Sequence, residues 1–185
     1  MRAWSGFALF LLVACGGGGQ GRVSPEGRVG AVRLAVQWAG TLSPGSPLQV
    51  EIRAESLPGL LQGSFRIQYD TSRLSVNAVD PGSFWVRRHN EMPACTGTLA
   101  VTKDFQNTGI LIVTLSRPGR QCGATDRAEG VIATIIFRAK QTIPSPNNLV
   151  SFVSDPQYQI VRDAEGNAYP VERITEQEVF FQLPE

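Results

Sequence analysis

Residues 47–84 read PLQVEIRAESLPGLLQGSFRIQYDTSRLSVNAVDPGSF, and this stretch decides the fold. Apolar and polar residues alternate over 48–57 and again over 63–69, with the pair Pro58-Gly59 between the two ranges. Alternation with a period of two is typical of β-strands that bury one face and leave the other in solvent. We therefore expect a strand over each range. The expected inward residues are Leu48, Val50, Ile52 and Ala54, followed by Phe65, Ile67 and Tyr69.

Segments of the same type recur along the chain. In residues 31–42 the expected inward positions are Val32, Leu34, Val36 and Trp38. Further strands are predicted over 74–79, 97–105, 109–116, 130–138, 149–153 and 178–183. The runs at 110–115 and 131–137 are almost continuously apolar, which is typical of strands that are covered on both faces or lie centrally in a sheet. With about nine short strands and no helical stripe, the sequence predicts an all-β protein, an antiparallel β-sandwich with jelly-roll topology.

Composition narrows the range of partners. The 185 residues are 42 % apolar, as in globular proteins, and 17 basic residues nearly balance 16 acidic ones. The basic residues are not clustered into a patch. We therefore expect no binding to nucleic acid and no polybasic membrane-binding face.

The N-terminus is expected to direct export and to carry a lipid. Residues 1–14 have one charge, Arg2, and a short apolar run, as in a secretory signal peptide. Leu12-Val13-Ala14-Cys15 resembles the bacterial lipobox, which implies cleavage before Cys15 and lipidation of its sulfur. The alternative is an ordinary signal peptide with an incidental cysteine. Residues 15–28 are rich in glycine and predict a flexible tether, and 29–185 predict one folded domain. The expected location is the cell envelope, at the outer membrane or cell surface rather than the inner membrane.

Two further cysteines fall at the open end of a predicted hairpin. The turn Gln106-Asn107-Thr108-Gly109 joins the strands 97–105 and 109–116. If Asn107 and Thr108 form the loop, Cys95 pairs opposite position 120, two residues from Cys122. Because exported proteins occupy an oxidising space, we expect a Cys95–Cys122 disulfide. The alternative is two free thiols, and no metal site is expected because no further ligand joins them.

The order of these elements resembles a cohesin domain. The resemblance rests on Pro58-Gly59, Tyr69-Asp70, the Leu74-Ser75-Val76 strand and Pro81-Gly82-Ser83-Phe84. It continues in NTGILIVTLS (107–116) and GVIATIIFRAK (130–140), and it covers about residues 31–183.

The resemblance implies a nine-stranded jelly-roll sandwich that acts as a non-catalytic recognition module. Cohesins bind dockerin modules carried by polysaccharide-degrading enzymes, and their fold is related to carbohydrate-binding modules. Two outward residues that bond dockerin in that family, an Asn and an Asp, correspond here to Gln62 and Ser64. The amide is retained and the carboxylate is not.

Candidate binding residues fall into two groups. The first is the polar strand face of Ser64, Arg66 and Gln68, which we expect Thr102, Lys103 and Thr114 to join. The second is the segment 85–90, in which Trp85 can stack on a sugar ring while Arg87 and Asn90 bond hydroxyl groups. The alternative for each group is structural: a solvated strand face, and an aromatic ring covering a sheet edge. Asp70 is expected to brace its own turn, with ligand binding as the alternative.

Catalysis and bound cofactors are not expected. The chain has one His and lacks the HExxH and GxSxG motifs. The stretch 162–170 lacks the spacing of an EF-hand and reads better as a hairpin turn at 164–167. We therefore expect a surface-anchored binding module for a protein partner, dockerin-like or another envelope protein, or for polysaccharide. The alternative is a structural subunit of a cell-envelope assembly.

Overall fold

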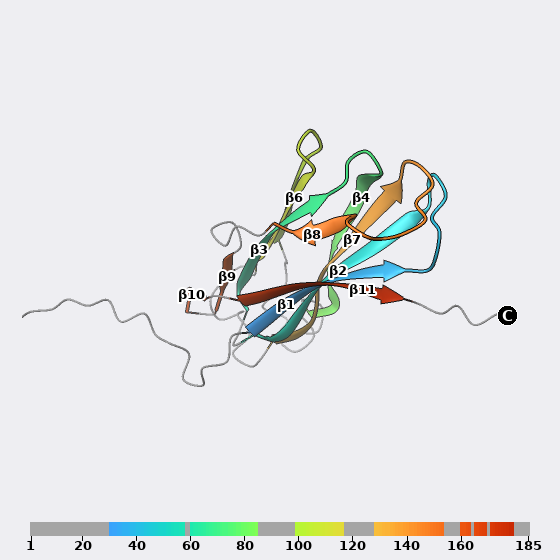
Figure 1. The fold of residues 1–185 in the computed structure, drawn as a ribbon. Coiled ribbons are helices and arrows are strands. Elements are labelled where there is room, and N and C mark those ends of the chain that lie inside the picture. The colour runs from blue at the N-terminus through green and yellow to red at the C-terminus, as the bar shows by residue number, and fades with distance from the viewer. Residues whose placement is uncertain are drawn as a thin grey trace, which may run out of the picture.

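The computed structural model describes residues 30–57, 60–84, 99–116, 128–153, 160–163, 165–169 and 171–179. Within these ranges the chain forms eleven strands in two sheets that pack face to face (Figure 1). The strands are β1 (Gly30–Trp38), β2 (Pro47–Leu57), β3 (Gln62–Tyr69), β4 (Leu74–Pro81), β5 (Leu99–Phe105), β6 (Ile110–Ser116), β7 (Ala128–Ala139), β8 (Val150–Phe152), β9 (Ile160–Arg162), β10 (Ala168–Tyr169) and β11 (Val171–Val179). The predicted all-β sandwich is confirmed.

The two sheets draw their strands from the whole length of the chain. The five-stranded sheet has the order β11-β1-β2-β7-β4, and the six-stranded sheet has the order β10-β9-β3-β6-β5, with β8 also pairing to β3. Consecutive strands often lie in opposite sheets, as in a jelly roll. The described pairs are antiparallel except β1 and β11, which run parallel from Gly30↔Val171 to Trp38↔Val179. No hairpin links the first and last strands, so the chain is free to bring them together in the same direction.

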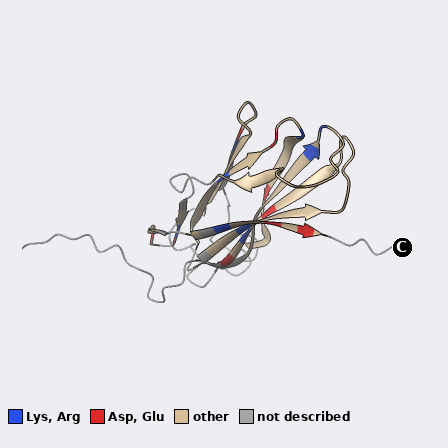
Figure 2. Ribbon diagram, viewed as in Figure 1, with Lys and Arg blue, Asp and Glu red and all other residues tan. Residues whose placement is uncertain are grey.

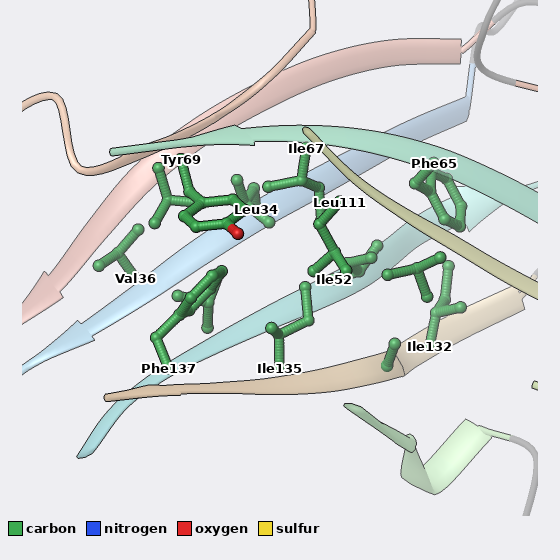
Figure 3. Packing of buried hydrophobic residues seen from close by; sticks show 14 of the residues in the cluster. Leu34, Val36, Ile52, Phe65, Ile67, Tyr69, Leu111, Ile132, Ile135 and Phe137 are labelled. Carbon is green, nitrogen blue, oxygen red and sulfur yellow. The ribbon is translucent and has the colours of Figure 1, made fainter. Parts of the chain in front are cut away.

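The core lies between the sheets and contains the residues predicted to point inward. Val32, Leu34, Val36 and Trp38 are buried on β1, and the expected inward residues of β2 and β3 are buried as well. The rings of Tyr69 and Phe137 come from opposite sheets and meet with centroids 5.2 Å apart (Figure 3). Burying side chains of this size contributes roughly 1.5–3 kcal/mol each, which makes this layer the main source of stability.

The hairpin of β5 and β6 has the predicted register. Leu99 pairs with Ser116 and Phe105 pairs with Ile110, so the strands are aligned as the Asn107-Thr108 loop requires. The turn closes through the carbonyl of Phe105, which accepts hydrogen bonds from the backbone N–H groups of Thr108 and Gly109. Gly109 has a φ of 68°, a conformation that glycine adopts without steric cost.

Steric constraints explain why the Pro-Gly-x-Phe segment has a glycine at position 82. A Cβ on Gly82 would lie 2.0 Å from the carbonyl oxygen of Val131, so no larger residue fits against β7. The Gly82 N–H donates to the Ile132 carbonyl at 2.8 Å. Phe84 follows and is buried, as its place in the motif predicts.

The C-terminal region differs from the sequence prediction. The strand expected over 178–183 had been given too late a start: β11 begins at Val171 and includes Glu178 and Val179, whereas residues 180–185 lie outside the described part of the chain. Two short strands, β9 and β10, had not been predicted. They flank the hairpin turn that was predicted at 164–167, with Arg162 paired to Ala168.

Several predicted features lie outside the described residues. These are the signal peptide and tether with Cys15, the Cys95–Cys122 pair, and the segment containing Trp85, Arg87 and Asn90. The structure therefore does not bear on lipidation, on the disulfide or on that candidate sugar site. Among the residues it does describe, no helix is long and apolar enough to cross a bilayer.

Candidate functional site on the outer face of the six-stranded sheet

The outward-pointing residues of β5, β6 and β3 form a surface of aligned rows, which we call the outer face. Cross-strand partners in an antiparallel sheet point to the same side, so the register defines the rows. Each row crosses from β5 through β6 to β3. The rows are Phe105–Ile110–Gln68, Lys103–Ile112–Arg66, Val101–Thr114–Ser64 and Leu99–Ser116–Gln62.

Strand β6 is apolar on both of its sides, although only one of them faces the core. Leu111, Val113 and Leu115 are completely buried between the sheets. Ile110 and Ile112 point the other way and are only partly buried. The continuous apolar run at 110–115 had predicted a strand that is covered on both faces or lies centrally in a sheet, and β6 does lie between β3 and β5. In the structure, the described part of the chain leaves the outward side of this strand partly open.

Phe105 extends the apolar part of the outer face. It pairs with Ile110 at the end of the β5–β6 hairpin, and it is 46 % exposed. Of the described residues, only Phe105 and Val179 are large hydrophobic residues with this much exposure, and Val179 lies at the end of β11. An apolar strip exposed on the outside of a sheet is a common sign of a protein-binding site.

The predicted polar residues of β3 do gather on this face, and two of them fix its shape. Ser64 and Thr114 share a hydrogen bond of 2.9 Å between their hydroxyl groups. Gln68 donates from Nε2 to the carbonyl of Thr108 at 3.3 Å, which links β3 to the β5–β6 turn. These contacts link β3 to β6 and to the β5–β6 turn on the outer face.

Thr102 does not belong to this face, contrary to the sequence prediction. It pairs with Val113, which points into the core, whereas its neighbour Lys103 pairs with the outward Ile112. Adjacent residues of a strand point to opposite sides, so Thr102 and Lys103 cannot share a surface. Lys103 and Thr114 remain part of the outer face.

Asp70 lies just beyond β3 and braces its own turn, as predicted. Its Oδ1 accepts hydrogen bonds from the Ser72 hydroxyl at 2.6 Å and from the Ser72 backbone N–H at 2.9 Å. The hydroxyl bond is the largest of the influences that lower the pKa of this carboxyl below its ordinary value, and partial burial opposes it. Because Oδ1 is occupied inside the turn, Asp70 stabilises the end of β3.

The five-stranded sheet has a different character: basic and acidic residues occur on its neighbouring strands (Figure 2), and several of them form ion pairs. Arg33 on β1 forms ion pairs with Glu55 on β2, at 2.7 Å, and with Glu176 on β11. Arg53 on β2 similarly pairs with Glu178 and with Glu51, each at 2.7 Å. These groups satisfy one another across three strands, so this surface is a set of closed ion pairs.

The described residues do not assemble a metal centre. They include no group of three or more His, Cys, Asp or Glu side chains placed to hold a metal ion. A cleft of about 350 Å³ between β11 and the segment before β8 is lined by one carboxylate, Glu176, which is already paired with Arg33. Among the described surfaces, we therefore take the outer face, with its partly exposed apolar residues, as the candidate binding site.

The fold agrees with structures of cohesin modules. A type II cohesin, A11 from Bacteroides cellulosolvens, aligns with a TM-score of 0.62 and 15 % identity over 80 % of this chain and 96 % of its own. The cohesin of a type I Coh-OlpA-Doc918 complex from Clostridium thermocellum aligns with a TM-score of 0.60 and 16 % identity, over 81 % of this chain and 99 % of its own. At these identities the structures show a common fold.

A second type II module, from the adaptor scaffoldin ScaA of Acetivibrio cellulolyticus, aligns with a TM-score of 0.62 and 12 % identity, over 85 % of this chain and 93 % of its own. A search of the curated proteins finds no matching relative. The sequence itself matches the family model of the cohesin domain over residues 32–159, most of the chain. With the two-sheet fold and the register of its strands, this match shows that the chain belongs to the cohesin family.

Proposed function

We propose that this protein is a non-catalytic recognition module that binds a dockerin-type protein partner through the outer face of its six-stranded sheet. The observation that carries the proposal is the apolar strip of Phe105, Ile110 and Ile112 on that face. Burying such a strip against a partner is favourable by roughly 25 cal/mol per Å² of apolar surface. The type I structure from Clostridium thermocellum that shares this fold is a cohesin–dockerin complex.

The geometry of the face suits a protein ligand better than a small molecule. It is a broad surface of aligned strands, braced by the Ser64–Thr114 and Gln68–Thr108 hydrogen bonds. Small-molecule sites are usually concave, whereas protein partners dock on flat surfaces with apolar centres and polar rims. Gln62 and Ser64 lie in the last two rows of this face, at the positions where the family pattern places dockerin contacts.

We also propose that the module is held at the cell envelope by a lipid on Cys15, through the glycine-rich tether of residues 15–28. The lipobox-like sequence Leu12-Val13-Ala14-Cys15 supports this. In such an arrangement the partner is an enzyme or scaffold brought to the cell surface, and the polysaccharide context belongs to that partner. Mass spectrometry of the mature N-terminus tests the anchor, and Cys15→Ala is expected to release the protein from the membrane fraction.

The docking face is tested by affinity capture with the folded domain. The domain, its Ile112→Lys variant and its Ile136→Lys variant are immobilised and exposed to protein secreted by the source cells. Ile136 is the matched control, because it is a partly buried outward isoleucine on β7 of the other sheet. We expect a dockerin-bearing protein to be retained by the wild type and by Ile136→Lys but not by Ile112→Lys.

Three results would contradict the proposal. One is equal retention by all three proteins, which would place the binding surface elsewhere. Another is binding to insoluble polysaccharide that is lost in Trp85→Ala, which would make the protein a carbohydrate-binding module. The third is stable co-purification with a large envelope complex that is insensitive to Ile112→Lys, which would indicate a structural subunit.

A further inference from the structure

The second row of the outer face places an isoleucine between two cations. Lys103 on β5 pairs in register with Ile112 on β6, and Ile112 pairs with Arg66 on β3. Neighbouring strands lie about 4.8 Å apart, so the two cationic residues are separated by about 10 Å along the row, with the isoleucine midway.

Within the described strands, the charged residues at the outward positions of this face have one sign. The outward positions of the described strands in the six-stranded sheet are known from the register. They are Gln62, Ser64, Arg66, Gln68, Leu99, Val101, Lys103, Phe105, Ile110, Ile112, Thr114, Ser116, Ser151, Ile160, Arg162 and Ala168. This set contains three basic residues and no Asp or Glu. The family pattern has a carboxylate near the start of β3. This chain has Ser64 at that position.

The ion-paired set on the opposite surface of the sandwich has a net charge of the opposite sign. There, Glu51, Glu55, Glu176 and Glu178 surround Arg33 and Arg53, so acidic groups outnumber basic ones within this set of ion pairs. An acidic partner is therefore repelled by one side of the molecule and attracted to the other. Such an arrangement guides the partner to the outer face and fixes its orientation.

We infer that the partner carries two carboxylates that flank an apolar side chain, so that the apolar group packs on Ile112 while the carboxylates meet Lys103 and Arg66. A helix that crosses the strands offers this spacing, because positions seven residues apart are about 10.5 Å apart along its axis. A residue three or four positions after the first carboxylate then lies over the isoleucine. The contact surface of the partner is therefore acidic. A face that kept the family's carboxylate would instead select a basic contact surface.

A protein partner fits these observations better than an anionic membrane. Recognition of anionic lipid usually needs four to eight clustered Lys or Arg residues, whereas this row has two cations separated by an isoleucine. The neighbouring rows contribute Ser64, Thr114 and Gln68, whose hydroxyl and amide groups suit hydrogen bonds to a protein surface.

The inference rests on the proposed docking face, but its test does not require the natural partner. The probes are two synthetic amphipathic helices of about four turns that differ only in charge. One has two glutamates seven positions apart with a leucine between them, and the other has lysines at those two positions. Titration calorimetry at low salt is expected to give an affinity at least about tenfold higher for the glutamate helix.

Charge reversal identifies the residues responsible. Lys103 is exposed, so Lys103→Glu is not expected to disturb folding. Arg66→Glu tests the cation at the other end of the row. We expect each to remove the preference for the glutamate helix, and the double variant to reverse it. Arg138→Glu, an exposed cation of the other sheet, is the matched control and should leave the preference unchanged. Circular dichroism confirms that each variant is folded.

The outcomes separate this inference from the proposed function. Equal or tighter binding of the lysine helix, or binding of neither helix, overturns the inference even if capture with Ile112→Lys supports the docking face. A preference that survives in the double variant also overturns it. Binding to phosphatidylglycerol vesicles that is lost in the same variants, without a preference between the helices, would assign the cations to a membrane surface instead. A glutamate preference without capture of a dockerin leaves the inference standing and rejects the named partner.

Discussion

The hydroxyl of Tyr69 on β3 donates a 2.6 Å hydrogen bond to Oδ1 of Asp104 on β5, reaching past the strand between them. Asp104 pairs with the buried Leu111, so this exposed carboxylate occupies a core-side position at the edge of the sandwich. An inward charge on an edge strand disfavours pairing with another sheet. The tyrosine satisfies that charge, and its ring packs on Phe137 of the other sheet.

Tyr69→Phe is expected to lower the free energy of unfolding by about 1 kcal/mol at neutral pH, because the ring contact is kept and one hydrogen bond is lost. Burial raises the pKa of the Tyr69 hydroxyl well above its usual range, and the hydrogen bond to Asp104 and the charge of that carboxylate raise it further. A group that holds its proton more tightly when folded stabilises the fold below its unfolded pKa of about 10 and loses that contribution as the pH rises further.

Urea unfolding at neutral pH and at about pH 10.5 checks this prediction. The difference in stability between the wild type and Tyr69→Phe should shrink at the higher pH. Absorbance of the phenolate form gives a second readout, because one of the chain's three tyrosines should ionise only on unfolding, and that late step should be missing from the variant. A constant difference at both pH values would contradict the role assigned to the hydroxyl.

Asp70→Ala is expected to lower the free energy of unfolding by about 1 kcal/mol at pH 7, through loss of the two hydrogen bonds from Ser72. The Ser72 hydroxyl lowers the pKa of this carboxyl when the protein is folded. The stabilisation is therefore present above the unfolded pKa of about 4 and is lost as the pH falls through the folded value.

Denaturant unfolding between neutral pH and about pH 3 should show the Asp70→Ala difference disappearing on the acid side. Ser72→Ala is the companion variant, because it removes the hydroxyl bond and keeps the one from the backbone. It should lose part of the stability lost in Asp70→Ala. An effect that is independent of pH would show that the charge on Asp70 does not contribute.

Gly109→Ala and Gly45→Ala form a matched pair. Both glycines have positive φ, 68° and 86°, so each substitution costs about 1 kcal/mol for the left-handed conformation. A Cβ on Gly109 would also lie 2.4 Å from the Tyr69 carbonyl oxygen, whereas nothing lies within 4 Å of one on Gly45. We expect Gly109→Ala to cost at least about 2 kcal/mol and Gly45→Ala about half of that. Equal losses would mean that the turn shifts without resistance.

Arg33→Met tests how firmly the last strand is attached. Arg33 bridges β2 and β11 through Glu55 and Glu176, and all three side chains are partly exposed. Ion pairs of this exposure contribute about 0.2–1 kcal/mol and are screened by salt. We expect a loss within this range per pair in dilute buffer, most of which disappears in about 1 M NaCl. Arg53→Met should behave in the same way, and an effect insensitive to salt would indicate packing by the arginine stem.

The sequence predicts the central strands well because burial imposes a regular pattern on them. Residues such as Val50, Ile52, Phe65 and Ile67 alternate with polar residues since one side of each strand faces the other sheet. The same reasoning fails for β11, whose apolar residues Val171, Ile174 and Val179 are irregularly spaced. This strand lies at an edge, and much of its surface is in solvent, so burial leaves no period of two to detect.

The candidate site could be predicted from the sequence only in part. The polar residues of β3 were predicted to form a face, and the register places Lys103 and Thr114 on it. The apolar run that includes Ile110 and Ile112 was interpreted as a strand covered on both faces or central in a sheet, and β6 is central. Sequence alone does not distinguish a strand covered by its own chain from one partly open to a partner. The arrangement of the sheets makes that distinction.

The parallel alignment of β1 with β11 gives the molecule two poles. Gly30 and Val171 lie at one end of the pair, and Trp38 and Val179 lie at the other. An N-terminal lipid would therefore be joined to the domain at the Gly30 pole, and the flexible tether of residues 15–28 would set how far the domain reaches from the bilayer rather than its orientation. Because packed sheets keep their strands within about 30° of a common direction, both broad surfaces run from one pole to the other. Neither surface is then covered by the attachment point at the Gly30 pole.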